Sequence, residues 1–356
     1  MRFELVDPYS REAAQIWSGL DARSYFLSWG WMANWLACLP ADRAPLLGVF
    51  RDGDRAVSAA CFGRRSQLRR GLIKSRSLHL NTTGVVRLDE LWIEYNGLVG
   101  ADLPLAALVE ALPESWDELV LPALDVDAFG GVREETHRGW HARVERRVPV
   151  YFVELETVRS SGLLPKLSGQ TRSQIRRAQK LTGEVSVEIA ADMVQAIEIY
   201  DELCTLHAAT WNTRGQPGAF ADPWFDRFHR RLIAERFRAG EIQMMRVRAN
   251  GATLGCLYNL VWRGRVLQYQ TGLTTSDDPR QKIGYVCHTA AIEHCASAGF
   301  DVYDFLGGDH RYKRSMSTAS GWLVWCKVQR SKLRFTVEEH LTKLARKLRG
   351  RRQKPA

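Results

Sequence analysis

Apolar and polar positions alternate along this chain with two periods, and the shorter period predicts strands. In residues 46–62 two apolar runs flank Asp52-Gly53, and the runs 242–248 and 254–262 flank Asn250-Gly251. Such dipeptides adopt the left-handed backbone that a tight turn between strands needs. Both segments are therefore predicted to be β-hairpins.

The longer period, with apolar residues three and four positions apart, predicts helices. Further short apolar runs predict additional strands. The predicted helices cover residues 25–36, 105–112, 168–180, 193–210, 223–238 and 286–298. The additional strands cover residues 118–124, 148–155, 265–273, 300–306 and 322–329. Helices and strands mix in both parts of the chain, so the pattern predicts an α/β or α+β fold.

Length, charge and these elements together predict three segments. A chain of 356 residues has room for about two domains. We place one lobe at residues 1–150, a second at 151–329 and a basic amphipathic tail at 330–356. The tail holds ten Lys or Arg against two Glu, whereas the rest of the chain carries 40 basic and 38 acidic residues. The formal charge of +10 is thus mainly a property of the tail.

Several classes of function lack their sequence signals. The seven cysteines are scattered and form no C-x-x-C pair, and no Walker A loop, G-x-S-x-G or H-E-x-x-H motif is present. These absences argue against a metal site, nucleotide hydrolysis and serine hydrolase chemistry. No apolar run approaches the ~20 residues that cross a bilayer, and the N-terminus lacks a secretory signal, so we expect a cytoplasmic protein.

The order of motifs in the second lobe resembles the GNAT acyltransferase core. A meander of strands, a charged turn at 277–285, a helix and the segment Asp304-Phe-Leu-Gly-Gly-Asp309 follow one another. More closely, the chain is similar to the FemAB-like and CelD-like (cellulose biosynthesis) acetyltransferases, which join two GNAT-like folds. The segment Phe26-Leu-Ser-Trp29 and the pair Tyr312-Lys313 stand in the order of that branch. The resemblance implies an α/β protein with tandem GNAT-like folds, whose mixed central sheets are flanked by helices.

The resemblance also implies an acyl-CoA donor, acetyl-CoA by default, bound at the turn before the helix predicted at 286–298. Gln281-Lys-Ile-Gly284-Tyr-Val286 matches two key positions of the family's Q/R-x-x-G-x-G/A motif, and Val286 departs from the last. A glycine lets the backbone approach a phosphate, and a helix N-terminus favours an anion. The residues assigned to the donor are Leu273, Arg280, Gln281, Lys282, Ile283, Gly284, Tyr285 and Val286.

Such enzymes, by the same resemblance, transfer the acyl group to an amine by direct attack, without a covalent enzyme intermediate. The amine needs a base and the leaving thiolate a proton. Asp309, at the glycine-rich exit of the predicted strand, is our preferred base, and Asp304 inside that strand is the alternative. Tyr269 and Tyr312 are candidate acids, although packing would also explain them. The candidate acceptor residues are His207, Trp211, Arg214, Gln270 and Lys313.

The acceptor could be the amine of a small molecule, a saccharide or a lipid-linked compound, in polysaccharide or envelope biosynthesis. Two other functions stay open: a Fem-type aminoacyl-tRNA-dependent peptide ligase, and a noncatalytic partner of a polysaccharide-synthesising machine. The near-neutral body argues against a large nucleic-acid footprint. The basic tail could adsorb to an anionic membrane, which would place the protein at the inner membrane face, or it could simply be solvated.

Overall fold

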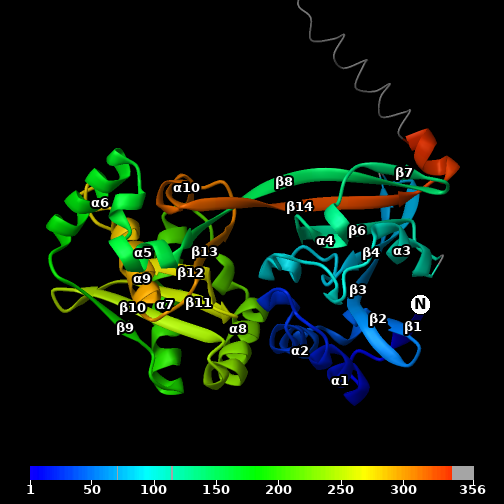
Figure 1. Cartoon of the computed structure of the whole chain (residues 1–356), viewed down its shortest axis with the longest axis horizontal. Coiled ribbons are helices and arrows are strands. Elements are labelled where there is room, and N and C mark those ends of the chain that lie inside the picture. Colours follow the sequence, from blue (N-terminus) through cyan, green and yellow to red (C-terminus); the bar gives the residue numbers. More distant parts are fainter. Residues whose placement is uncertain (70, 114, 339–356) are drawn as a thin grey trace, which may run out of the picture.

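The computed structural model describes residues 1–69, 71–113 and 115–338, and its elements are labelled in Figure 1. The strands are β1 (Arg2–Val6), β2 (Leu46–Asp52), β3 (Arg55–Arg69), β4 (Ile73–Leu80), β5 (Val99–Gly100), β6 (Glu118–Asp125), β7 (Glu135–His137), β8 (Trp140–Glu154), β9 (Val185–Ile189), β10 (Ile242–Ala249), β11 (Ala252–Trp262), β12 (Arg265–Leu273), β13 (Val302–Gly307) and β14 (Ala319–Arg330). The α-helices are α1 (Arg11–Gly19), α2 (Trp29–Cys38), α3 (Leu105–Ala111), α4 (Ala128–Gly131), α5 (Leu155–Ser161), α6 (Gly169–Thr182), α7 (Met193–Asn212), α8 (Pro223–Arg236), α9 (Ile283–Ser297) and α10 (Arg311–Met316).

The strands form one mixed sheet in the order β1-β2-β3-β4-β6-β14-β8-β13-β12-β11-β10-β9. The same pattern occurs twice in it. In the first half (β1–β7 and their helices), antiparallel β2, β3 and β4 lead to β6, which is parallel to β4. In the second half (β9–β13 and their helices), antiparallel β10, β11 and β12 lead to β13, which is parallel to β12.

The long strands β8 and β14 join the two halves. β14 pairs with β6 of the first half and with β8, and β8 pairs in turn with β13 of the second half. Figure 1 shows both strands running along one side of the molecule from one half to the other. The lobe boundary predicted at 150/151 therefore lies inside β8, and Arg330, the first residue of the predicted tail, ends β14.

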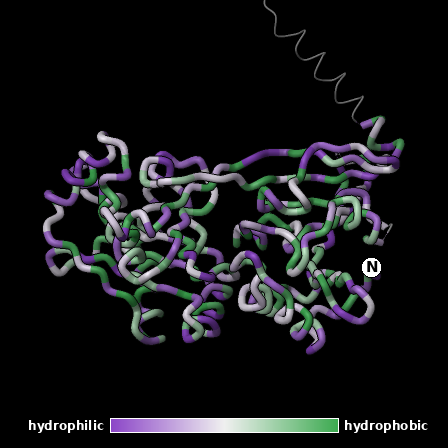
Figure 2. Tube along the Cα trace, viewed as in Figure 1, coloured by the Kyte–Doolittle hydropathy of each residue, from purple (hydrophilic) through white to green (hydrophobic). Residues whose placement is uncertain are grey.

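Apolar side chains bury an interface between the halves as well as a core within each. Trp31 on α2 packs edge-on against Phe228 on α8, with ring centroids 5.0 Å apart. The indole N–H of Trp224 donates to the carbonyl of Cys38 at 2.8 Å. Hydrophobic residues accordingly occur in both halves of the chain trace in Figure 2.

The predicted hairpins are confirmed, because β2 pairs with β3 around Asp52-Gly53 and β10 with β11 around Asn250-Gly251. The prediction of a single helix over residues 25–36 places its first residue wrongly, because α2 begins at Trp29. Residues 25–27 form a 3₁₀ turn, and the Ser28 hydroxyl then accepts a hydrogen bond from the N–H of Trp31, which caps a new helix at residue 29.

The predicted start of the helix at 286 is also wrong, because α9 begins at Ile283. Lys282 adopts a left-handed backbone, with φ of 41°, and lets the helix begin at the next residue. Within the described part of the chain, no helix combines the length and apolar character that a membrane span requires. Residues 339–356, most of the predicted tail, lie outside the described residues.

Candidate functional site

The strands β12 and β13 separate partway along the sheet. They pair in parallel only where residues 265–267 lie beside residues 302–304. Beyond this point β12 stays with β11, whereas Gly307 of β13 pairs with Val150 of β8. The register between β11 and β12 shifts at Tyr269, which is a bulge residue. The separation leaves a wedge between the strands at their C-terminal ends.

A cavity of about 550 Å³ opens beside this wedge, a size that suits a cofactor-scale ligand. Its walls come from the end of β12, the loop that follows, the first turns of α9, one residue of α6 and the start of α10. The lining includes the predicted donor residues Leu273, Lys282, Ile283, Gly284 and Tyr285, together with the predicted acid Tyr312.

The first turns of α9 supply two features that favour a ligand in this cavity. The helix has 15 residues, and its free N–H groups and dipole favour an anion at the start. His288, one turn into the helix, lines the cavity and is buried, yet its Nδ1 atom has no hydrogen-bond partner. Its ring stacks on Tyr312, with centroids 5.3 Å apart. Burial lowers the pKa of His288 to about 3, so its imidazole is neutral.

Three predicted donor residues do not line the cavity. The guanidinium of Arg280 bonds to the Asp278 carboxylate at 2.8 and 2.9 Å, and this bonding lowers the pKa of Asp278 to about 2. Gln281 lies on the same turn, and its N–H donates to the Asp278 carbonyl at 3.0 Å. Val286 is buried in the core of the second half, so the residue that departs from the motif faces away from the cavity.

The two carboxylates proposed as bases have very different surroundings. Asp309 is exposed, accepts a hydrogen bond from the Tyr151 hydroxyl at 3.1 Å and forms an ion pair with Arg314. The bond from Arg314, followed by that from Tyr151, lowers the pKa of Asp309. A carboxylate so stabilised is a weaker base.

Asp304 is completely buried. Its carboxylate accepts hydrogen bonds from the Tyr95 hydroxyl at 2.6 Å, from Arg265 at 3.0 Å and from the N–H of Leu306 at 2.8 Å. Burial raises its pKa despite these contacts. The side chain therefore ties β13 to the first half of the chain through Tyr95.

The two tyrosines proposed as acids also differ. The hydroxyl of Tyr269 donates to the carbonyl of Leu91 at 2.7 Å, and its ring packs against Trp31 in the interface between the halves. Tyr312 lines the 550 Å³ cavity, and burial raises its pKa to about 12. The phenol of Tyr312 therefore keeps its proton at neutral pH.

The predicted acceptor residues do not converge. His207, buried on α7, packs against Phe220 and Trp211, and Arg214 lies over the Trp211 ring at 5.2 Å. Gln270 lies on β12 opposite Tyr258. Neither these residues nor Lys313 line the 550 Å³ cavity. The ammonium of Lys313 is buried and donates to the carbonyls of Leu306 and Gly307 at 3.3 and 2.6 Å, holding the end of β13.

Sequence reasoning missed Glu94, which the fold brings to the end of β13. Its carboxylate accepts a hydrogen bond from the N–H of Gly307 at 2.7 Å, and the residue is partly exposed. A side chain at position 307 would begin 3.2 Å from this carboxylate, so the glycine leaves room for it. Burial raises the pKa of Glu94 to about 7, while Gly307 and the charge of Lys313 act in the opposite direction. No local motif marks Glu94, because its partners lie more than 200 residues away.

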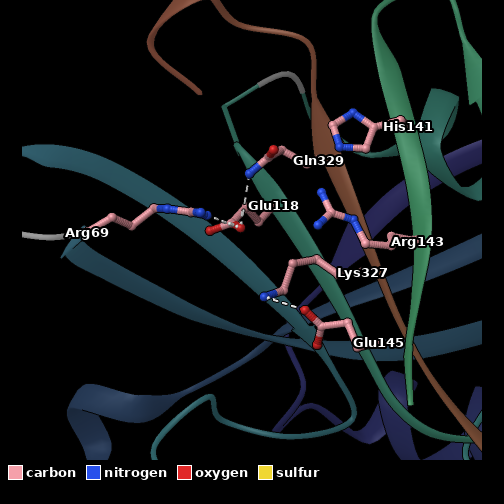
Figure 3. A pocket seen from close by; sticks show the side chains of 7 residues that line it. All are labelled: Arg69, Glu118, His141, Arg143, Glu145, Lys327 and Gln329. Atoms are coloured by element: carbon pink, nitrogen blue, oxygen red, sulfur yellow. Dashed lines mark hydrogen bonds and ion pairs between the residues drawn. The ribbon is translucent and has the colours of Figure 1, made fainter. Parts of the chain in front are cut away.

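A smaller charged pocket is lined by residues of β6, β14 and β8 together with Arg69 of β3. Figure 3 shows Arg69 and Gln329 pointing toward Glu118, and Lys327 toward Glu145. Its volume is about 100 Å³. The pocket is too small for an acyl donor, and these charges largely satisfy one another. Across residues 1–69, 71–113 and 115–338 there is no cluster of three or more His, Cys, Asp or Glu side chains that could hold a metal ion.

Comparison with solved structures shows the fold. The crystal structure of FemX is similar with 9% identity and a TM-score of 0.53, covering 92% of this chain and 97% of that one. A conserved protein from Bacteroides thetaiotaomicron has 11% identity and a TM-score of 0.52, over 93% and 99% of the two chains. The C-terminal domain of a putative lysylphosphatidylglycerol synthetase from Agrobacterium fabrum has 16% identity and a TM-score of 0.50, over 90% and 91%.

Comparison with protein families identifies the second half. Residues 166–314 match the family described as the acetyltransferase (GNAT) domain, and this range contains the wedge and the whole lining of the 550 Å³ cavity. No curated protein matches the chain significantly. The repeated strand order together with this match confirms the predicted tandem GNAT-like fold. Residues 166–314 are a GNAT acetyltransferase domain, and the protein that carries it is an acyltransferase.

Proposed function

We propose that this protein is an acyl-CoA-dependent N-acyltransferase, with acetyl-CoA as the default donor and an amine as acceptor. The observation that carries the proposal is the 550 Å³ cavity at the wedge between β12 and β13, inside the region that matches the GNAT family. GNAT folds generally take their acyl group from acyl-CoA. The start of α9 would receive the pyrophosphate, and the unpaired edge of β12 beyond residue 267 offers backbone groups to the pantetheine amides.

Glu94 is the base in this proposal, in place of Asp309. A base for an amine should have a pKa near the working pH and lie where the reacting groups meet. Glu94 has a pKa raised to about 7 and lies at the end of β13, where the wedge opens. Asp309 is paired with Arg314, which makes its proton affinity lower.

Tyr312 is the acid in this proposal. It lines the donor cavity and, with a pKa raised to about 12, retains the proton that a leaving thiolate needs. The amine nitrogen attacks the thioester carbon, the new C–N bond forms, and the C–S bond breaks. Glu94 takes the proton that nitrogen loses, and the thiolate receives one from Tyr312.

The finer placement within the FemAB-like and CelD-like branch, and a role in polysaccharide or envelope synthesis, stay predictions of the sequence. The same holds for a saccharide or lipid-linked acceptor and for contact with a membrane through the tail. An aminoacyl-tRNA-dependent ligase is the rival activity.

Gly284→Glu tests the donor site. Gly284 lines the cavity, and a Cβ there would meet only a Leu273 methyl group at 3.3 Å, so the variant should fold. The added carboxylate fills space near the pyrophosphate and repels it, and coenzyme A affinity measured by calorimetry should fall by about 10²-fold or more. Gly169→Glu, at the exposed first position of α6, is the matched control and should bind normally.

Unchanged affinity in folded Gly284→Glu would refute the donor site. Wild-type protein that binds aminoacyl-tRNA but no coenzyme A would support the ligase instead.

A further inference from the structure

A second cavity, of about 300 Å³, lies in the first half, and the acyl donor cavity shares none of its lining residues. Residues 92–95 connect it to the proposed reaction centre. Trp92 and Ile93 line the cavity, whereas Glu94 and Tyr95 hydrogen-bond to Gly307 and Asp304 of β13. A ligand in this cavity therefore lies against the segment that carries the proposed base.

The walls of this cavity are mainly apolar and aromatic. Val86, Ile93, Val120 and Pro122 line it together with Trp92 and Trp325. Trp92 is 60% exposed, so its ring is available at the rim. Aromatic faces of this kind attract a cation as well as an apolar body.

The charged side chains that line the cavity are acidic. Asp89 accepts hydrogen bonds from Thr83 and Gly84 at 2.7 to 2.8 Å, so both of its carboxylate oxygens already have partners within the protein. Glu90 is the other acidic residue of the lining and is the one that we expect to meet a ligand. Burial lowers the pKa of the lining residue His79 to about 4, so its imidazole is neutral. No lysine or arginine of the described residues is part of the lining.

The nearest basic side chains have other partners. Arg65, whose charge acts on His79 and Asp89, donates to the carbonyl of the lining residue Gly84 at 2.8 Å, and Lys327 pairs with Glu145 at 2.9 Å. Arg146 packs on the Trp325 ring at 4.1 Å, and Arg87 bonds to Asp222 at 2.7 Å. None of these four side chains is part of the lining. A phosphate or carboxylate on a ligand would therefore find acidic neighbours and no lining cation, which is unfavourable.

We propose that this cavity is the acceptor site and that it takes a small alkylamine or arylalkylamine without a phosphate or carboxylate group. The inference rests on the proposed N-acyltransferase function. Glu90 and the ring of Trp92 favour the ammonium form of the amine as it enters, and Glu94 removes its proton at the wedge. Its nitrogen then attacks the thioester carbon and the C–S bond breaks. The second proton that the nitrogen loses replaces the one that Tyr312 gives to the thiolate, so the products are an amide and free coenzyme A. The volume suits a small amine rather than a macromolecule.

The test compares phenethylamine with phenylalanine, which adds only a carboxylate, in the presence of desulpho-coenzyme A. Calorimetry of the full chain should show phenethylamine binding at least ~10-fold more tightly than phenylalanine. Trp92→Ala and Glu90→Gln should each weaken phenethylamine binding by roughly 10-fold and leave desulpho-coenzyme A affinity unchanged. Trp322→Ala, an exposed tryptophan on β14 outside the cavity, is the matched control and should bind normally.

Equal binding of phenethylamine to wild type, Trp92→Ala and Glu90→Gln would overturn the assignment. So would tighter binding of phenylalanine, or an absence of phenethylamine binding by a protein that still binds desulpho-coenzyme A. Failure of the wild type to bind desulpho-coenzyme A would instead refute the proposed function itself.

Discussion

At the scale of single residues, Glu94 shows how the surroundings of a carboxylate determine what it can do. Burial raises the pKa of Glu94 to about 7, and the nearby positive charge of Lys313 acts in the opposite direction by stabilising the carboxylate. Asp309, which is exposed and ion-paired, has a lowered pKa. Asp304 is completely buried and hydrogen-bonded on both oxygens. Of the three, Glu94 combines a raised pKa with partial accessibility.

Glu94→Gln should remove the base while preserving the shape of the side chain. In the wild type the fraction of Glu94 present as carboxylate rises as the pH rises through about 7, so kcat/KM should rise over the same interval. The variant should lose about 10²-fold in kcat/KM at neutral pH and lose this limb of the profile. Steady-state thiol release between pH 5.5 and 9 measures both effects.

Asp309→Asn decides between the two proposed bases in the same assay. If Asp309→Asn loses kcat/KM over the whole pH range while Glu94→Gln keeps its rate and the limb near pH 7, the role returns to Asp309. Coenzyme A affinity, measured in parallel, shows whether either variant has disturbed the donor cavity.

At the scale of elements, the segment that follows β14 is held to the first half by buried charge. Asp117 is 1% exposed, and its carboxylate bonds to Lys332 at 2.6 Å and to Arg334. Arg330, the last residue of β14, stacks on Trp116 at 4.4 Å. The segment 330–338 thus belongs to the folded body, although its composition resembles that of a solvated tail.

Two truncations test this attachment. Deleting residues 330–356 leaves Asp117 without both cations, and loss of the partners of a buried charge costs about 3–5 kcal/mol. The free energy of unfolding, measured by urea denaturation, should fall by about this amount. Deleting only residues 339–356 keeps Lys332 and Arg334 and should change it by less than about 1 kcal/mol. Equal stability of the two truncated proteins would contradict the attachment.

At the scale of the whole molecule, one sheet passes through both halves, and the proposed site draws on both. The donor cavity belongs to the second half, whereas Glu94 and the proposed acceptor cavity belong to the first. β8 supplies Tyr151 and Val153 to the core of the second half, and its other end pairs with β7 of the first. We therefore expect the halves to fold together.

Excision of residues 166–314, the range that matches the GNAT family, tests this expectation. The fragment lacks β8 and β14, so β13 would become an open edge and Tyr303 and Phe305 would lose neighbours in the core. Circular dichroism should show no cooperative thermal transition for the fragment and one transition for the full chain. A fragment that unfolds cooperatively and binds coenzyme A would show that the halves are independent.

Local chemistry was sufficient to predict both hairpins and most of the longer helices and strands, and it singled out the turn before α9 as the candidate donor site. Asn-Gly and Asp-Gly dipeptides favour hairpins because a tight turn needs a left-handed backbone at two adjacent residues, and these residue types adopt it readily. Gln281-x-x-Gly284 lies at the start of α9, and five of the eight residues assigned to the donor line the cavity. The sequence alone misplaced the start of α9. A lysine side chain gives no sign that its residue will adopt the left-handed backbone that Lys282 has at the helix start.

Only the tertiary structure brought together the groups proposed for chemistry. Glu94 meets Gly307 across 213 positions of sequence, and its pKa depends on burial between two halves that no local pattern connects. Likewise, the cavity beside Trp92 includes Trp325, which reaches it because β14 returns to pair with β6. Strand pairing at long range and desolvation are properties of the folded chain, since both depend on which distant residues become neighbours.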